Sequence, residues 1–182
     1  GCKQSCLINS GRMIMESAVN ARQNRTAYYF NDNEMFTMSL QGEIAALLYK
    51  ATKQGKRLAM RLNGTSDLDW TAIYKAFPTV QFYEYTKRPD LAKKLNKIEN
   101  VHITFSKHEN HSELNVKKLL ASGVNVAVVF NKEVPANYIN ITVIDGDKHD
   151  RRFEDKQGRI IGLKLKGTNR VKQLAIESGF AV

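Results

Sequence analysis

Residues 80–105 read VQFYEYTKRPDLAKKLNKIENVHITF, and this stretch decides the class of fold. Its two ends, 80–85 and 101–105, are short and rich in aromatic and β-branched residues, which is typical of β-strands. The lysine-rich residues between them, 90–98, predict a helix. A strand, a helix and a second strand in so short a span form a βαβ unit, so the two strands are expected to be parallel.

The same alternation of strands and helices continues on both sides of this unit. Further strands are predicted at 57–62, 125–130, 139–144 and 159–165. Further helices are predicted at 13–25, 39–54, 69–77, 112–122 and 168–178, and the aromatic residues 27–36 are interpreted as irregular. The segment 125–130 is a continuous apolar run, which is typical of a strand buried on both faces of a parallel sheet.

These elements predict an α/β fold with a mainly parallel sheet built from short βα units. The short spacing favours a partial or distorted TIM-barrel-like arrangement, and an open doubly wound sheet is the alternative. Residues 151–164 read RRFEDKQGRIIGLK and suggest a C-terminal hairpin with its turn at 156–158. No linker rich in Gly, Ser or Pro interrupts the chain, so residues 1–182 are expected to form a single α/β domain.

The charge of the chain indicates the kind of partner to expect. A net charge of +10 favours polyanionic partners, namely nucleic acid, phosphorylated small molecules or an anionic membrane surface, although solubility alone also explains such a charge. No apolar run approaches the roughly 20 residues that span a bilayer, and the first residues lack the apolar core of a signal peptide. We therefore expect a cytoplasmic protein, without membrane insertion, that binds nucleic acid or a nucleotide.

The polar residues that follow the predicted strands are the candidates for a binding site. In parallel α/β folds the ligand lies at the carboxyl ends of the strands, where the loops converge. Loops are polar in any protein, so each residue taken singly is weak evidence. The residues expected to bind the ligand are Asn63, Thr65, Ser66, Tyr85, Lys87, Arg88, Ser106 and Arg151. Those expected to act in catalysis are Asp67, Asp145 and Asp147.

Two acidic segments suggest metal-assisted chemistry on a phosphate. Asp145 and Asp147 directly follow an apolar strand, and their carboxylates are suited to holding Mg²⁺ or to acting as a general base. Cations are interleaved with these acids, so a self-compensating surface turn is the alternative. Asp67 lies in the segment 63–70, NGTSDLDW, in which Asp69 is the expected N-cap of the next helix.

The segment 83–89, YEYTKRP, places aromatic residues next to cations. This combination suits a nucleotide or single-stranded nucleic acid, with Lys87 and Arg88 neutralising phosphate. A strand end packed beneath a basic loop has the same composition. The competing hypothesis is a non-catalytic nucleic-acid-binding protein that uses lysines on helix faces, namely Lys93, Lys94, Lys97, Lys117 and Lys118.

The two cysteines, Cys2 and Cys6, form an incomplete cluster motif. The third position of a C-x3-C-x2-C triplet is Asn9, so these residues alone do not predict an iron–sulfur cluster, and free thiols are expected. A further alternative is an iron–sulfur or redox protein whose remaining ligands come from elsewhere. His108 and His111 lie three residues apart without further ligands, so a zinc site is not predicted.

Several segments together resemble one known family. They are Cys2–Cys6 followed by Ser10-Gly11-Arg12, Arg61–Trp70, Tyr83–Pro89, Ile103–Ser106, Val143–Asp147 and Gly162–Gly167. With these segments the chain resembles the gene product eighty-eight-like proteins of phages and plasmids, over nearly its whole length. The resemblance implies a viral or mobile-element origin, and it implies no particular activity. It also implies another cysteine ahead of the position of Cys2.

Overall fold

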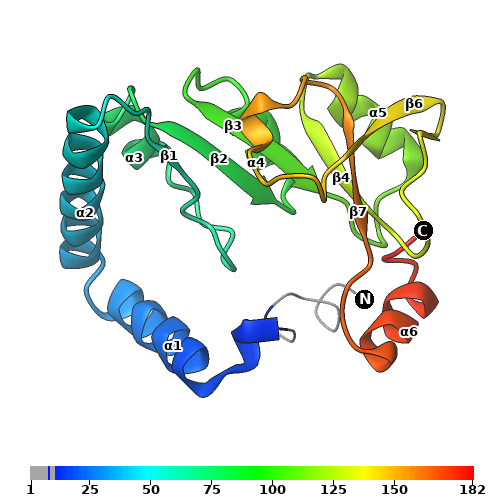
Figure 1. Ribbon diagram of the computed structural model, residues 1–182, viewed down its shortest axis with the longest axis horizontal. Helices are drawn as coiled ribbons and strands as arrows, with labels where there is room; N and C mark the ends of the chain where they lie inside the picture. The colour runs from blue at the N-terminus through cyan, green and yellow to red at the C-terminus, as the bar shows by residue number, and fades with distance from the viewer. Residues whose placement is uncertain (1–7, 9–10) are drawn as a thin grey trace.

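The fold is an open, seven-stranded, mostly parallel sheet, seen in a computed structural model that describes residue 8 and residues 11–182 (Figure 1). In sheet order the strands are β1 (Ala59–Met60), β2 (Gln81–Thr86), β3 (Val101–Ser106), β4 (Asn125–Phe130), β7 (Ile160–Lys164), β6 (Ile141–Asp145) and β5 (Asn137–Tyr138). All neighbouring pairs are parallel except β5 and β6. The predicted α/β class and parallel sheet are confirmed. Because β1 and β5 form two free edges, the sheet is open and does not close into a barrel.

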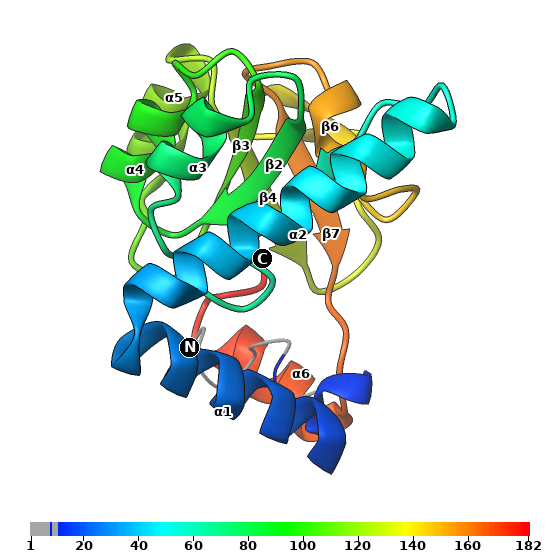
Figure 2. The same cartoon turned by 90° about the vertical axis from the view of Figure 1, so that its left-hand side faces the viewer.

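Three short helices connect the first four strands and cover one face of the sheet. They are α3 (Thr71–Ala76), α4 (Pro89–Leu95) and α5 (Glu113–Ala121), and Figure 2 shows them together on the same side of the strands. Consecutive parallel strands joined by crossovers of one hand place their helices on one face. The buried side chains of α4 and α5, such as Leu91 and Val116, pack in one core cluster with Ile103 and Phe105 of β3.

The opposite face of the sheet is covered by the crossover from β6 to β7. This segment contains the 3₁₀ helix η3 (Arg152–Glu154), which lies against β2 and β3. The ring of Phe153 packs against that of Tyr83 at a centroid distance of 5.6 Å. Residues of β2 therefore alternate, with Phe82, Glu84 and Thr86 buried and the tyrosines between them half-buried.

The hairpin predicted for residues 151–164 does not form. Strand β7 pairs with β4 on one side and with β6 on the other, so both of its edges are occupied. The antiparallel pair occurs earlier, between β5 and β6, around a two-residue turn in which Ile139 and Asn140 have φ values of 49° and 65°. Two successive residues with positive φ match the right-handed twist of a hairpin.

The aromatic residues 27–36, interpreted as irregular, are helical except at one residue. Helix α1 (Glu16–Asn31) and helix α2 (Asn33–Lys53) meet at Asp32, whose side chain accepts a hydrogen bond from the backbone N–H of Met35 at 3.0 Å. The ring centroid of Tyr29 lies 5.5 Å from that of Phe36 and 5.8 Å from that of Trp70. Packing of these rings therefore outweighs the weaker helix propensity of aromatic residues.

The helices near the two ends of the chain lie beyond the carboxyl ends of the strands. Figure 1 shows α1 and α6 (Asn169–Glu177) on the side toward which the parallel strands point, with η2 (Gly11–Ile14) leading into α1. Within the described part of the chain, none of the helices combines the length and the apolar character needed to cross a membrane.

Candidate functional site

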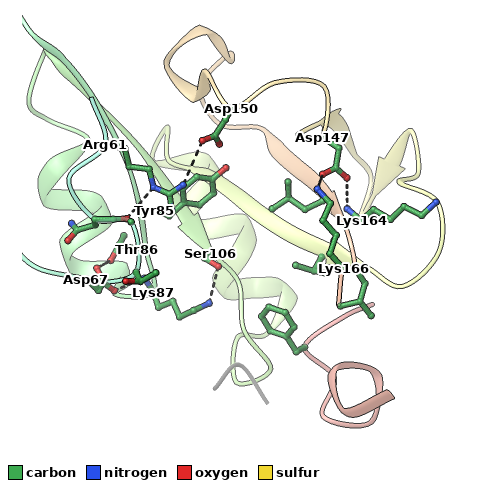
Figure 3. Close-up of a pocket in the computed structure, with 18 of the residues that line it drawn as sticks. Arg61, Asp67, Tyr85, Thr86, Lys87, Ser106, Asp147, Asp150, Lys164 and Lys166 are labelled. Carbon is green, nitrogen blue, oxygen red and sulfur yellow. Dashed lines mark hydrogen bonds and ion pairs between the residues drawn. The ribbon is translucent and has the colours of Figure 1, made fainter. Parts of the chain in front are cut away.

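A cavity of about 680 Å³ lies at the carboxyl edge of the sheet. Figure 3 shows residues that follow β1 and residues at the end of β2 on one wall, and residues that follow β6 or lie at the end of β7 on the other. The cavity thus joins the loops after residues 62, 85 and 144, which carry most of the predicted site residues. Its polar lining is Arg61, Asn63, Thr65, Ser66, Asp67, Tyr85, Thr86, Lys87, Ser106, Asp147, His149, Asp150, Lys164 and Lys166.

Asp67 ties the loop after β1 to the end of β2. One carboxylate oxygen accepts a hydrogen bond from Thr86 Oγ1 at 2.6 Å, and the other accepts one from the backbone N–H of Lys87 at 2.9 Å. Both oxygens of this predicted catalytic residue are therefore engaged in holding two strand ends together. The structure gives Asp67 a positioning role at the cavity wall.

Glu84 supports the same loop from inside the core. Its buried carboxylate accepts hydrogen bonds from the backbone N–H groups of Leu62 and Asn63, at 2.7 and 3.0 Å, and from the hydroxyl of Tyr74 at 3.1 Å. Burial raises the pKa of Glu84. Sequence reasoning did not select Glu84, although an acid in the inward-facing phase of the strand 80–85 was a usable signal.

Asn63 shapes the loop rather than offering its amide to a ligand. Its Oδ1 accepts hydrogen bonds from Ser66 Oγ, the backbone N–H of Leu68 and Trp70 Nε1, at 2.8, 3.1 and 3.2 Å. Its Nδ2 donates to the carbonyl of Leu68 at 2.9 Å. The loop is thus held in one shape, and it leaves Thr65 and Ser66 exposed.

Lys87 brings a positive charge to the cavity. Its ammonium group donates a hydrogen bond to Ser106 Oγ at 2.9 Å and lies 5.5 Å from the ring centroid of Phe180. Figure 3 shows the side chain extending along the wall toward Ser106. Among residues 8 and 11–182, no carboxylate lies within ion-pairing distance of this ammonium group. Lys87 is therefore available to an anionic ligand.

Arg61 is stacked over Tyr85 on the same wall, above Lys87 in the view of Figure 3. Its guanidinium carbon lies 4.6 Å from the ring centroid, its Nε donates to the carbonyl of Asn63 at 3.2 Å, and its Nη1 lies 3.8 Å from Asp150. Burial raises the pKa of Tyr85 to about 12, so the ring remains a neutral phenol at physiological pH. Sequence reasoning missed Arg61, although a cation at the carboxyl end of a predicted strand was visible.

Asp147 organises the opposite wall. Its carboxylate accepts hydrogen bonds from the backbone N–H of Lys164 at 2.8 Å and from Lys166 Nζ at 2.6 Å. Partial burial is the largest single influence and opposes ionisation, but the hydrogen bonds from Lys166 and the Lys164 backbone, together with nearby positive charges, outweigh it and lower the pKa of Asp147. The side chain of Lys164 points away from the cavity, toward Glu133 (Figure 3). The two lysines of this wall are therefore already paired with acids.

An apolar surface completes the cavity on the side of β4, β7 and α6. It consists of Val129, Leu163, Leu165, Val171 and Phe180. The volume of the cavity lies within the range of small-molecule sites, about 300 to 1,000 Å³. The cavity suits a ligand with one charged and one apolar part.

The histidines after β3 add little positive charge at neutral pH. The ring centroids of His108 and His111 lie 4.0 Å apart, and the ring of His111 packs against that of Phe105. Burial and the nearby charge of Lys87 lower the pKa of His108, and burial with neighbouring positive charges lowers that of His111. Both imidazoles are therefore expected to be neutral at physiological pH, and they add no charge to that of Lys87.

The remaining predicted residues lie outside the cavity lining. Asp145 accepts a hydrogen bond from the backbone N–H of Asp147 at 3.0 Å and so shapes its own turn. Arg88 lies 3.7 Å from Asp90, and Arg151 pairs with Glu154 at 2.8 Å. Within the described ranges, no group of three or more His, Cys, Asp and Glu side chains is arranged to hold a metal ion. Cys2 and Cys6 lie outside the described residues.

Comparison with known proteins identifies the family. Searches of curated proteins and of solved structures find no match to the chain. The family model described as Gene product 88 matches residues 1–182, as the resemblance of the strand-end segments predicted. The chain therefore belongs to the Gene product 88 family.

Proposed function

We propose that this protein binds a phosphate-bearing ligand of nucleotide size in the cavity at the carboxyl edge of the sheet. The observation that carries the proposal is the ammonium group of Lys87, which lines the cavity without a carboxylate partner among the described residues. Ser106 Oγ lies 2.9 Å from that group and supplies a second hydrogen-bonding atom for a phosphate oxygen.

The two unlike parts of the cavity support a nucleotide over inorganic phosphate. Lys87 and Ser106 form a polar end, whereas Leu163, Val171 and Phe180 belong to the apolar surface. A nucleotide presents a phosphate to the first and a flat, weakly polar base to the second. Its base recovers free energy from burial that a bare phosphate ion does not.

The proposal concerns binding rather than catalysis. Asp67 and Asp147, the two predicted catalytic residues that line the cavity, each accept two hydrogen bonds from neighbouring loops. Asp145, which was expected to share a magnesium ion with Asp147, does not line the cavity. The carboxylates are therefore better suited to shaping the cavity than to holding Mg²⁺ or moving a proton.

The lysines of the competing hypothesis serve as controls. Lys93 and Lys94 belong to α4, and Lys117 and Lys118 belong to α5. None of these four belongs to the lining of the cavity, and Lys94 is paired with Asp69 at 2.6 Å. Nucleic-acid binding through α4 and α5 would respond to their removal, whereas binding in the cavity would not.

Calorimetric titration with AMP, GMP, CMP, UMP and inorganic phosphate tests the proposal. We expect at least one nucleotide to bind more tightly than phosphate. Lys87→Met should weaken that binding about tenfold to a hundredfold, the usual cost of losing a hydrogen bond to a charged group. Lys117→Met removes the same charge from the exposed face of α5 and should change nothing. The proposal fails if no nucleotide binds, or if Lys87→Met binds as tightly as the wild type.

A further inference from the structure

A second cavity adjoins the first across the loop after β1. It has a volume of about 570 Å³, and Thr65 and Ser66 line both cavities. Its other lining residues belong mainly to α1 and are Ile8, Val19, Arg22, Gln23, Thr26, Ala27 and Phe30. The two cavities therefore lie on either side of a narrow polar ridge formed by Thr65 and Ser66.

Hydrogen bonds from neighbouring residues hold this ridge in one conformation. Asn63 and Glu84 hold the loop from below through the hydrogen bonds described above, and Asp67 ties its far end to β2. A ligand that extends beyond the first cavity would cross the exposed residues Thr65 and Ser66 and enter the second.

The second cavity offers the groups that one nucleotide unit needs. Arg22 is half-buried, and its Nη1 donates to the carbonyl of Met13 at 2.9 Å, which orients the guanidinium and leaves its other donors available. No carboxylate of the described residues forms an ion pair with Arg22. Phe30 also lines the cavity and is 75% exposed, so much of its ring surface is accessible for stacking with a base.

We propose that the ligand is a single-stranded nucleic acid rather than a free nucleotide, an inference that rests on the proposed function of the first cavity. One nucleotide occupies the cavity beside Lys87, and its neighbour crosses Thr65 and Ser66 into the cavity beside α1. There Arg22 neutralises a phosphate and Phe30 stacks on a base. The net charge of +10 favours a polyanion as the partner.

A single strand fits these features better than a duplex does. Stacking on an exposed ring requires an unpaired base, and the bases of a duplex are already stacked on each other. Two small cavities separated by a ridge also accept splayed nucleotides one at a time. The duplex is therefore included as an arm of the test.

The test compares a mononucleotide with a short strand on the full chain. AMP and the tetranucleotide of adenylates are titrated by calorimetry, and the ratio of their dissociation constants is measured. We expect the tetranucleotide to bind at least about tenfold more tightly, because a stacked base and a further phosphate contact are gained. Arg22→Ala and Phe30→Ala should each remove much of this advantage while leaving the dissociation constant for AMP unchanged.

Two matched variants control for general effects. Arg25→Ala removes an exposed cation from the same helix without altering either cavity, and Tyr49→Ala removes an exposed ring from α2. Both should retain the wild-type ratio. Arg22→Ala should also lower the dependence of log K on log salt for the tetranucleotide by about 0.7, the value for one lost phosphate contact on a single strand. Arg22→Lys should retain most of that dependence, and thermal unfolding reports whether the variants fold.

Each outcome decides nucleotide binding in the first cavity, strand binding across both cavities, or both. If AMP binds and the tetranucleotide binds no better, the extended site is wrong and the first cavity keeps its function. If Arg25→Ala weakens tetranucleotide binding as much as Arg22→Ala does, the second cavity is not a specific subsite. If a duplex of the same length binds as tightly as the single strand, the strand assignment is overturned. If the tetranucleotide and all four mononucleotides of the first titration fail to bind, both proposals fall.

Discussion

The two walls of the cavity share one hydrogen-bonding pattern and differ in a single donor. On the first wall, Asp67 accepts a backbone N–H from Lys87 and a hydroxyl from Thr86. On the second, Asp147 accepts a backbone N–H from Lys164 and the ammonium group of Lys166. In both cases an aspartate in the loop after one strand ties that loop to the end of the neighbouring strand.

The difference in donor decides which wall can meet an anion. A hydroxyl satisfies Asp67 without using a positive charge, so the ammonium group of Lys87 is left for a ligand. Asp147 instead takes the charge of Lys166. Lys87 and Lys166 thus have different roles, because Asp67 is satisfied by a neutral hydroxyl whereas Asp147 is satisfied by an ammonium group.

Glu84→Ala should cause the largest loss of stability, and this loss should come from the first wall, because Glu84 supports only that wall. The substitution leaves the backbone N–H groups of Leu62 and Asn63 and the hydroxyl of Tyr74 without their acceptor. Each buried unsatisfied donor costs about 1–3 kcal/mol, so we expect the free energy of unfolding to fall by about 3 kcal/mol or more. Urea denaturation measures the loss, with the exposed Glu99→Ala as control. A loss below about 1 kcal/mol contradicts the assigned role.

The two tethers themselves should differ in strength. Asp67→Ala removes two hydrogen bonds in a half-buried loop and should cost about 2 kcal/mol of unfolding free energy. Asp147→Ala also removes two, but the Lys166 side chain is 69% exposed, so about 1 kcal/mol is expected. The two variants are compared by urea denaturation at one pH and salt concentration. Equal losses indicate that the walls do not differ in their tethers.

Removing the paired lysine should affect ligand binding less than removing the unpaired one. Lys166→Met deletes a charge that Asp147 already neutralises, so we expect nucleotide affinity to change by no more than about twofold, against about tenfold or more for Lys87→Met. Calorimetry on both variants gives the comparison. If Lys166→Met weakens binding as strongly as Lys87→Met, both walls contribute charge to the ligand.

The smallest expected effect is on the titration of Asp147. Its pKa in the folded protein lies below the ordinary value of 3.8, so its stabilising contribution is present above that value and is lost as pH falls through the folded pKa. Carboxyl chemical shifts in an NMR pH titration locate the midpoint. Lys166→Met should move this midpoint upward toward 3.8. An unmoved midpoint shows that the Lys166 hydrogen bond does not control the carboxylate.

Particular residues show how far sequence reasoning reached the site. Lys87, Ser106 and Tyr85 were chosen because they follow predicted strands, and all three line the cavity. Arg88 and Arg151 were chosen on the same ground, but each side chain pairs with an acid close to it in the chain. Choosing the residues that follow predicted strands identifies which loops converge, because parallel strands share one carboxyl edge. It does not indicate which side chains in a loop turn toward that edge.

The α/β class, most of the strands and helices, and the loops that line the cavity could be predicted from the sequence alone. These depend on the local periodicity of apolar residues and on turn residues, which act over a few positions. The position of β7 between β4 and β6, which places Asp147 and Lys166 opposite Lys87, is known from the folded structure alone. The tertiary structure also decided that Asp67 and Asp147 are tethers, because a carboxylate's role depends on the donors that distant segments bring to it after folding.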